Sequence, residues 1–298
     1  MQSKGFLLAL AALVLFALVG CGGGSSSSSG SSKASTRQRL IATTRVFRDV
    51  YAMAGLARRG TSTSSSKATS RASSRTVSRR VAFLLSALHG TRGVQQGLDP
   101  DTSLTYRLTV NSDGSGREDL FTDSTYRTPA GAFIWGPPQW SNGKPNTYPA
   151  VFHVTYNITA GNFAGTSGTM DVTLKDASGL NCLIHLALKD LQNDTATCVF
   201  TIVAGVADCT DTCTLGDGAT YTEQDQTDDN GDIQSNVDFS DGWQEDMSTN
   251  TDGTTDETLT DSSGDTEASG DCQSDGSDTI DYSDGSSEDV NVDTSSEN

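Results

Sequence analysis

Glycine recurs at short intervals through the last third of the chain. The series Gly218, Gly231, Gly242, Gly253, Gly264, Gly276 and Gly285 advances by 9 to 13 residues, and most members directly follow Asp or Asn. Such pairs are typical of hairpin turns, because glycine readily adopts the positive φ that these turns require. The intervals leave room for one short strand between turns. The spacing therefore predicts a meander of β-hairpins.

The turns also set a register. If the three residues that end at each glycine form the loop, Phe239 pairs with Trp243 and Met247 lies opposite Glu257. The rule gathers the apolar residues of each hairpin on one face. Against it, Asp, Gly and Ser are poor strand formers and apolar residues are scarce after Met247. A solvated coil is the alternative for this part of the chain.

Upstream, apolar and polar residues alternate with a period of two. Leu104, Tyr106, Leu108 and Val110 form the first such segment, and the others lie at 152–158, 170–174, 184–188 and 198–202. No helical pattern interrupts these segments, which favours an antiparallel sheet over βαβ units. The Pro-rich segment 128–148, which includes Trp135 and Trp140, is predicted to be one long loop.

Two amphipathic helices are predicted before the strands. Apolar residues recur at helical spacing over 36–59, ending at Gly60, and again over 77–88, ending at Gly90. Arginines flank both apolar stripes. Two interpretations stay open: the helices lie on an anionic membrane face, or they pack on each other and on the β-domain. The fold class is mainly β, an antiparallel meander or sandwich-like domain preceded by two helices.

Charge is strongly segregated along the chain. Residues 33–98 hold thirteen Lys or Arg and one acid, whereas residues from Asp99 onward hold six basic and thirty-seven acidic residues. No Lys or Arg follows Lys189, and the net charge is −18. Nucleic acid would be repelled by the acidic part. A cationic partner or divalent ions suit it, and the two oppositely charged parts should attract each other.

The N-terminus carries an export signal. Lys4 precedes an apolar run of about fourteen residues, which is shorter than the roughly twenty that span a bilayer. The run ends in Leu18-Val19-Gly20-Cys21, which resembles the lipobox of bacterial lipoproteins. The resemblance covers about the first two dozen residues. It implies cleavage before Cys21, acylation of Cys21 and a stable membrane anchor outside the cytoplasm. In a diderm host, Gly22 in place of Asp favours the outer membrane.

Five further cysteines follow the lipobox. Cys182, Cys198, Cys209 and Cys213 are candidates for disulfides, and Cys272 makes the number odd. Within one hairpin, a Cys182–Cys198 bridge would centre the turn near residue 190, but the turn-like residues are 192–194. The pairing stays open, with Cys209 and Cys213 able to close on each other or on an earlier cysteine.

No enzyme signature is present. The three histidines His89, His153 and His185 belong to no G-x-S-x-G, H-E-x-x-H or P-loop pattern. The zinc-like spacing of Cys182 and His185 with the later cysteines is better explained by disulfides or buried thiols. Calcium loops fail in detail, because Gln226 and Val237 occupy ligand positions around Gly231. Weak calcium binding along Asp-rich turns stays an alternative. An enzyme site in the loop 135–140 is a third class with no residue to nominate.

The sequence thus predicts five regions: a signal peptide (1–20), lipidated Cys21 with a Gly/Ser tether (21–35), a basic helical region (36–98), a β-domain (99–215) and an acidic meander or disordered tail (216–298). We expect an envelope protein with a membrane-lipid anchor and no cofactor beyond that lipid. Its expected role is non-enzymatic: surface, binding or structural. A divalent-cation-dependent adhesin or ligand-binding module is the alternative.

Overall fold

The computed structural model describes residues 33–56, 78–89, 93–99, 102–228 and 230–293. The predicted signal peptide, Cys21 and most of the predicted tether lie outside the described residues. So does the Ser-rich segment between the two helices. The described part is mainly β, as predicted, and contains two helices, α1 (Lys33–Ala54) and α2 (Arg79–Leu88), that precede the strands.

The described residues form seventeen strands in one antiparallel sheet. The first nine are β1 (Gly93–Asp99), β2 (Leu104–Val110), β3 (Gly116–Phe121), β4 (Pro129–Trp135), β5 (Gln139–Trp140), β6 (Ala150–Ile158), β7 (Ser167–Leu174), β8 (Cys182–Lys189) and β9 (Thr195–Val203). The remaining eight are β10 (Val206–Thr214), β11 (Thr220–Thr227), β12 (Ile233–Phe239), β13 (Gln244–Thr249), β14 (Thr255–Thr260), β15 (Thr266–Cys272), β16 (Ser277–Tyr282) and β17 (Ser287–Asn291).

The sheet is a meander in which neighbours in sequence are neighbours in space. Each strand pairs with the next one, except that β4 pairs with β6 and the two-residue β5 also pairs with β6. The ladder continues without a break from β9 through β10 into the acidic strands β11 to β17. The meander predicted for the last third is confirmed, and the solvated-coil alternative is wrong for residues 230–293.

The glycine turns have the predicted register. The Phe239 N–H donates to the Trp243 carbonyl at 2.9 Å, and Met247 pairs with Glu257. Gly242 has a φ of +91°, a conformation in which a residue with an L side chain would be strained. In the next loop the Asp252 carboxylate accepts the Thr254 N–H at 3.0 Å, the Asx geometry that makes Asp a turn former.

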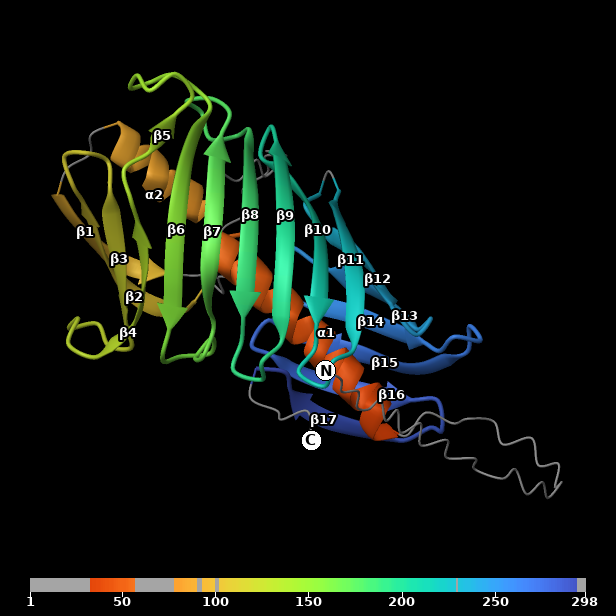
Figure 1. Ribbon diagram of the computed structural model, residues 1–298. Helices are drawn as coiled ribbons and strands as arrows, with labels where there is room; N and C mark the ends of the chain where they lie inside the picture. Colours follow the sequence, from red (N-terminus) through yellow and green to blue (C-terminus); the bar gives the residue numbers. More distant parts are fainter. Residues whose placement is uncertain (1–32, 57–77, 90–92, 100–101, 229, 294–298) are drawn as a thin grey trace, which may run out of the picture. The chain divides into compact units, whose positions relative to one another are not determined.

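Helix α1 lies inside the curl of the sheet. It contacts β8 and β9 on one side and β14 and β15 on the other, as Figure 1 shows. From Leu40 to Ala54 every α1 residue except Arg48 is buried. A helix surrounded by a sheet needs apolar or well-paired side chains on all faces, and a single apolar stripe is not sufficient. The helix is therefore a part of the core that the sheet wraps.

Helix α1 ends earlier than its apolar periodicity predicted. Gly55, with a φ of +70°, follows the last helical residue, and the Leu56 N–H donates to the Tyr51 carbonyl at 2.8 Å. This is the Schellman arrangement that ends many helices. A Cβ at Gly55 would lie 2.8 Å from Arg80 Cγ, because the start of α2 abuts this turn. The expected end at Gly60 was wrong.

The segment expected to be one loop contains strands. Strand β4 pairs with β3 and β6 across most of its length. Gly131 has a φ of +144°, and a Cβ there would lie 2.4 Å from the Asn157 carbonyl oxygen. This glycine and a register shift beside Phe121 break the alternation that marks a strand. The segment therefore contains a strand without regular alternation, whose Phe133 and Trp135 are core residues.

Candidate functional site

The basic side chains of α1 bind to the acidic sheet. Its four arginines all form ion pairs with carboxylates of the sheet or of the segments that flank its strands: Arg37 with Glu288, Arg39 with Asp241, Arg45 with Asp190 and Asp194, and Arg48 with Asp293. The expected attraction between the basic and acidic parts is thus confirmed. Of the two interpretations of the helices, the described residues support packing on the β-domain.

Arg45 carries the most buried of these pairs. Its Nε donates to Asp190 at 3.0 Å, and its Nη2 pairs with Asp194. The three side chains are at most 4% exposed. The same carboxylates organise the β8–β9 turn, since Asp190 also accepts the Asp194 N–H at 2.8 Å. Helix α1 and this turn are therefore joined by one charged network.

A second network joins α2 to the first strands. Arg80 donates to Asp99 of β1 at 3.1 Å and pairs with Glu118 of β3, and Arg79 pairs with Asp99. The guanidinium carbon of Arg80 lies 3.7 Å from the centre of the Phe133 ring. Burial is the main cause that raises the pKa of Glu118, to about 7. Both helices are thus bound by buried charge as well as by apolar packing.

Six further carboxylates lie on the inner face of the sheet, the face that α1 covers. We call them the acidic stripe; they come from β10, β11, β13, β14 and β16 and are each 1 to 3% exposed: Asp211, Glu223, Asp225, Glu245, Glu257 and Asp278. The structure describes no ion pair between any of them and a Lys, Arg or His. Like charges on facing strands destabilise a sheet, and Asp211 and Glu223 are direct partners across β10 and β11.

Helix α1 offers hydroxyl groups to the acidic stripe. Thr43 donates to Glu245 at 2.7 Å, Thr44 donates to Glu257 at 2.6 Å, and the Tyr51 hydroxyl donates to Asp225 at 2.9 Å. These bonds satisfy one oxygen of each acid. No N–H or hydroxyl group among the described residues donates to either oxygen of Glu223. A proton on Glu223, shared with a neighbouring carboxylate, would satisfy one of these two oxygens.

Burial raises the pKa of every member of the acidic stripe. The pKa rises to about 6 for Asp278, about 7 for Asp211 and about 8 for Glu245. For Glu223 and Glu257 the pKa lies well above its usual value, because neighbouring carboxylates add to the effect of burial. Near neutral pH the stripe therefore keeps part of its protons, which makes an uncompensated acidic interior tolerable.

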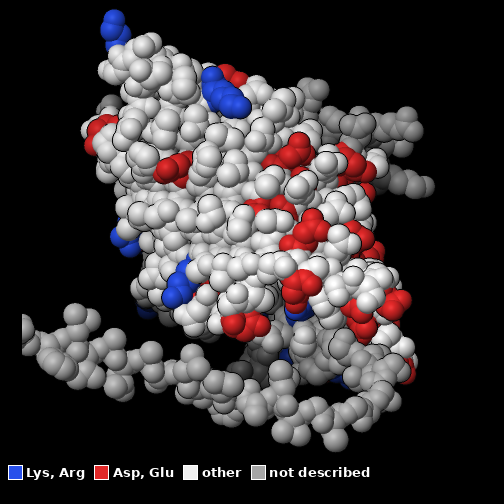
Figure 2. Space-filling model, turned by 45° about the vertical axis from the view of Figure 1, so that its right-hand side comes forward, with Lys and Arg blue, Asp and Glu red and all other residues white. Residues whose placement is uncertain are grey.

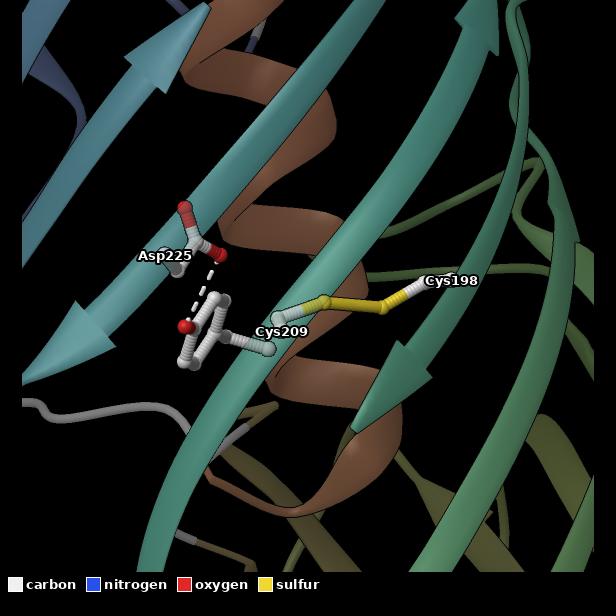
Figure 3. Close-up of a disulfide and its surroundings, with 4 residues drawn as sticks. Cys198, Cys209 and Asp225 are labelled. Carbon is white, nitrogen blue, oxygen red and sulfur yellow. Dashed lines mark hydrogen bonds between the residues drawn. A yellow bond between two sulfur atoms is a disulfide. The ribbon is translucent and has the colours of Figure 1, made fainter. Parts of the chain in front are cut away.

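One disulfide lies beside this stripe. Cys198 of β9 and Cys209 of β10 are bonded, and Figure 3 shows the bond next to Asp225 with its hydrogen bond dashed. Cys182 and Cys213, the other two candidates, are free and buried, as is Cys272. Cys182 pairs with Ile202 across the hairpin, so the register argument against a Cys182–Cys198 bridge holds. The sequence had left the pairing open.

The other face of the acidic strands is charged and open to solvent. Its outward positions hold one exposed aspartate on each of β12 to β16, which we call the outer acidic face: Asp238, Asp246, Asp256, Asp271 and Asp281. Figure 2 shows most Asp and Glu in view on the right-hand side, with a few on the left, and Lys and Arg at the top, on the left and near the bottom. The strands thus have acids on both faces, largely desolvated within and hydrated outside.

Other predicted features have structural roles or lie outside the described residues. Cys21 lies outside them. Trp135 is buried and its Nε1 donates to the Gly114 carbonyl at 3.1 Å, which makes it a core residue. A small apolar cavity of about 40 Å³ lies beside the last turns of α1, lined partly by Phe47, Tyr51 and Phe163.

No three His, Cys, Asp or Glu side chains converge on a metal position within the part of the chain that the structure describes. Neither helix in this part is both long and apolar enough to cross a bilayer. The turn aspartates that a calcium site would use, such as Asp252 and Asp261, already accept backbone N–H groups of their own loops.

The acidic stripe is the feature that sequence reasoning missed. The register rule placed Glu257 opposite Met247, on the face where it gathers the apolar residues of each hairpin, which was the available signal that an acid faces inward. The acidic, Asp-rich composition of this part of the chain instead suggests full solvation. Comparisons of the chain with protein-family models, with curated proteins and with solved structures found no match.

Proposed function

We propose that this protein is a non-enzymatic lipoprotein of the bacterial cell envelope that presents the outer acidic face to a cationic partner. Acylated Cys21 is the anchor, and the Gly/Ser tether links it to the β-domain. The observation that carries the binding role is the row of exposed aspartates on β12 to β16, in a region without any Lys or Arg.

Charge of this kind favours recognition of cationic surfaces. The aspartates stand on neighbouring strands of one sheet, so their spacing is fixed by the hydrogen-bonded ladder. Fixed like charges raise the local potential, which speeds association with a cationic partner and makes it salt-dependent. The buried α1 ties this face to the rest of the sheet, because its Thr43 and Thr44 bind the inner side of β13 and β14.

The binding role is tested with a cationic polypeptide as the probe. We expect the full chain to bind immobilised poly-lysine, and Asp246→Asn/Asp256→Asn to weaken that binding several-fold more than Asp113→Asn/Asp119→Asn. Both variants change the net charge by the same amount, and the control pair lies on the β2–β3 side of the sheet. Surface plasmon resonance at two salt concentrations is the measurement. Equal losses in the two variants would show that net charge alone, without a specific face, explains binding.

The anchor has a separate test. We expect Cys21→Ala to move the protein from the membrane fraction to the soluble fraction after cell disruption, because the acyl chains supply the durable part of membrane binding. The substitution Gly22→Ser, at the next residue, is the matched control and should stay with the membrane. Retention of Cys21→Ala at high salt would contradict the anchor.

A further inference from the structure

Two of the three histidines of the chain lie side by side with an aspartate on the outer face of the sheet. His153 is on β6, Asp171 on β7 and His185 on β8. The strand register pairs His153 with Asp171 and Asp171 with His185. The three residues therefore form one straight row across three hydrogen-bonded strands. We call it the His-Asp-His row.

The row faces away from α1 and is open to solvent. The neighbours Phe152 and Val154 of His153, and Ile184 and Leu186 of His185, are buried, so the row occupies the opposite face of the strands. The side chains of His153 and Asp171 are 56% and 50% exposed. His185 is exposed as well, so solvent reaches all three residues.

Two members of the row, His153 and Asp171, already contact each other. His153 Nδ1 lies 2.5 Å from Asp171 Oδ1, which orients the ring beside the carboxylate. Neighbouring strands lie about 4.8 Å apart, so His153 and His185 stand one strand to either side of Asp171. An ion above Asp171 would be within reach of both rings through nitrogen, at the metal–nitrogen distance of about 2.0–2.1 Å. The side chains are not yet gathered around one point, and exposed imidazoles need only turn about χ1 and χ2 to converge.

We infer that the His-Asp-His row binds one divalent transition-metal ion, with His153, Asp171 and His185 as its protein ligands. Two imidazoles and one carboxylate suit Zn²⁺, Ni²⁺ or Cu²⁺, whereas Ca²⁺ and Mg²⁺ prefer oxygen ligands alone. The remaining coordination positions face solvent and are filled by water. This site is on β6 to β8, away from the outer acidic face, and does not depend on the proposed function.

The third histidine provides a matched control. His89 follows the last residue of α2, and its side chain is exposed far from the row in sequence. We expect calorimetry with Zn²⁺, in a background of excess Mg²⁺ that occupies diffuse carboxylate sites, to give one ion per chain with micromolar affinity. His153→Gln, His185→Gln and Asp171→Asn should each weaken binding about tenfold or more. His89→Gln should bind as the wild type does.

A spectroscopic measurement on the wild-type protein identifies the ligands without relying on the variants. Cu²⁺ bound to the wild-type full chain should show electron paramagnetic resonance couplings from two imidazole nitrogens. Binding that survives in all three row variants, or a bound Cu²⁺ with oxygen ligands alone, would overturn the site. So would the absence of saturable one-to-one binding in the wild type.

Discussion

The protein is expected to melt at a higher temperature at pH 5 than at pH 8.5, by on the order of 10 °C. The cause is the acidic stripe. Its carboxyl groups are buried, face one another and have no cationic partner among the described residues. Most proteins lose stability when acid protonates their paired carboxylates. Here protonation relieves the interior of charge, so mild acid stabilises the fold.

The direction of this pH dependence follows from the raised pKa values of the acidic stripe. A carboxyl group whose pKa is raised in the folded state binds its proton more tightly there than in the unfolded chain. Its contribution is fully present below the unfolded pKa, near 4, and is lost as pH rises through the folded pKa. The folded pKa values of Asp278, Asp211 and Glu245 are about 6, 7 and 8. Stability should therefore decline between pH 4 and 8.

Two substitutions on one strand separate the stripe from the overall charge. Glu257 faces α1 and Asp256 faces solvent, so Glu257→Gln and Asp256→Asn remove the same charge on opposite sides of β14. We expect Glu257→Gln to raise the melting temperature at pH 8.5 by several degrees and to change it little at pH 5. Asp256→Asn should have a small effect at both. Scanning calorimetry measures this, and equal effects of the two substitutions would show that surface repulsion causes the pH dependence.

Loss of the Arg45 side chain should destabilise the fold strongly. Arg45→Met leaves Asp190 and Asp194 buried without their cation, and such a loss typically costs about 3–5 kcal/mol. The β8–β9 turn that these carboxylates organise should loosen as well. Urea unfolding monitored by tryptophan fluorescence gives the change in the free energy of unfolding.

The matched control is another arginine of the same helix. Arg37 pairs with Glu288 where both side chains are partly exposed, so Arg37→Met should cost less than about 1 kcal/mol. The triple variant Arg45→Met/Asp190→Asn/Asp194→Asn removes the charges together and should recover more than half of the loss. If Arg45→Met cost no more than Arg37→Met, the buried network would contribute nothing beyond a surface pair.

Local patterns were sufficient to predict most of the sheet. The three-residue loop rule predicted the Phe239–Trp243 and Met247–Glu257 pairs, because a glycine with positive φ fixes both the turn and the register. Strand β4 was missed because Gly131 and a bulge break the alternation. The disulfide was left open because Cys198 and Cys209 meet only once β9 and β10 are in register.

The burial of charge depends on tertiary contacts that no local pattern contains. Arg45 and Asp49 look like the polar edge of an amphipathic helix, yet both are 4% exposed because the sheet curls around α1. Glu245 and Glu257 alternate with hydrated neighbours as surface residues do. Their burial follows from α1 covering the inner face of β13 and β14. A sequence gives the alternation but does not say which face is covered.

The sorting of acids into a protonated interior and a charged exterior is the central claim, and carboxyl titration tests it most directly. The whole chain has only seven glutamates, so selective ¹³C labelling of the Glu carboxyl carbon gives few signals. Three of the seven, Glu223, Glu245 and Glu257, belong to the buried acidic stripe. We expect these three to remain largely protonated at pH 6, each signal being assigned by its Gln variant. Titration of all three below pH 5, as in an unfolded chain, would contradict the claim.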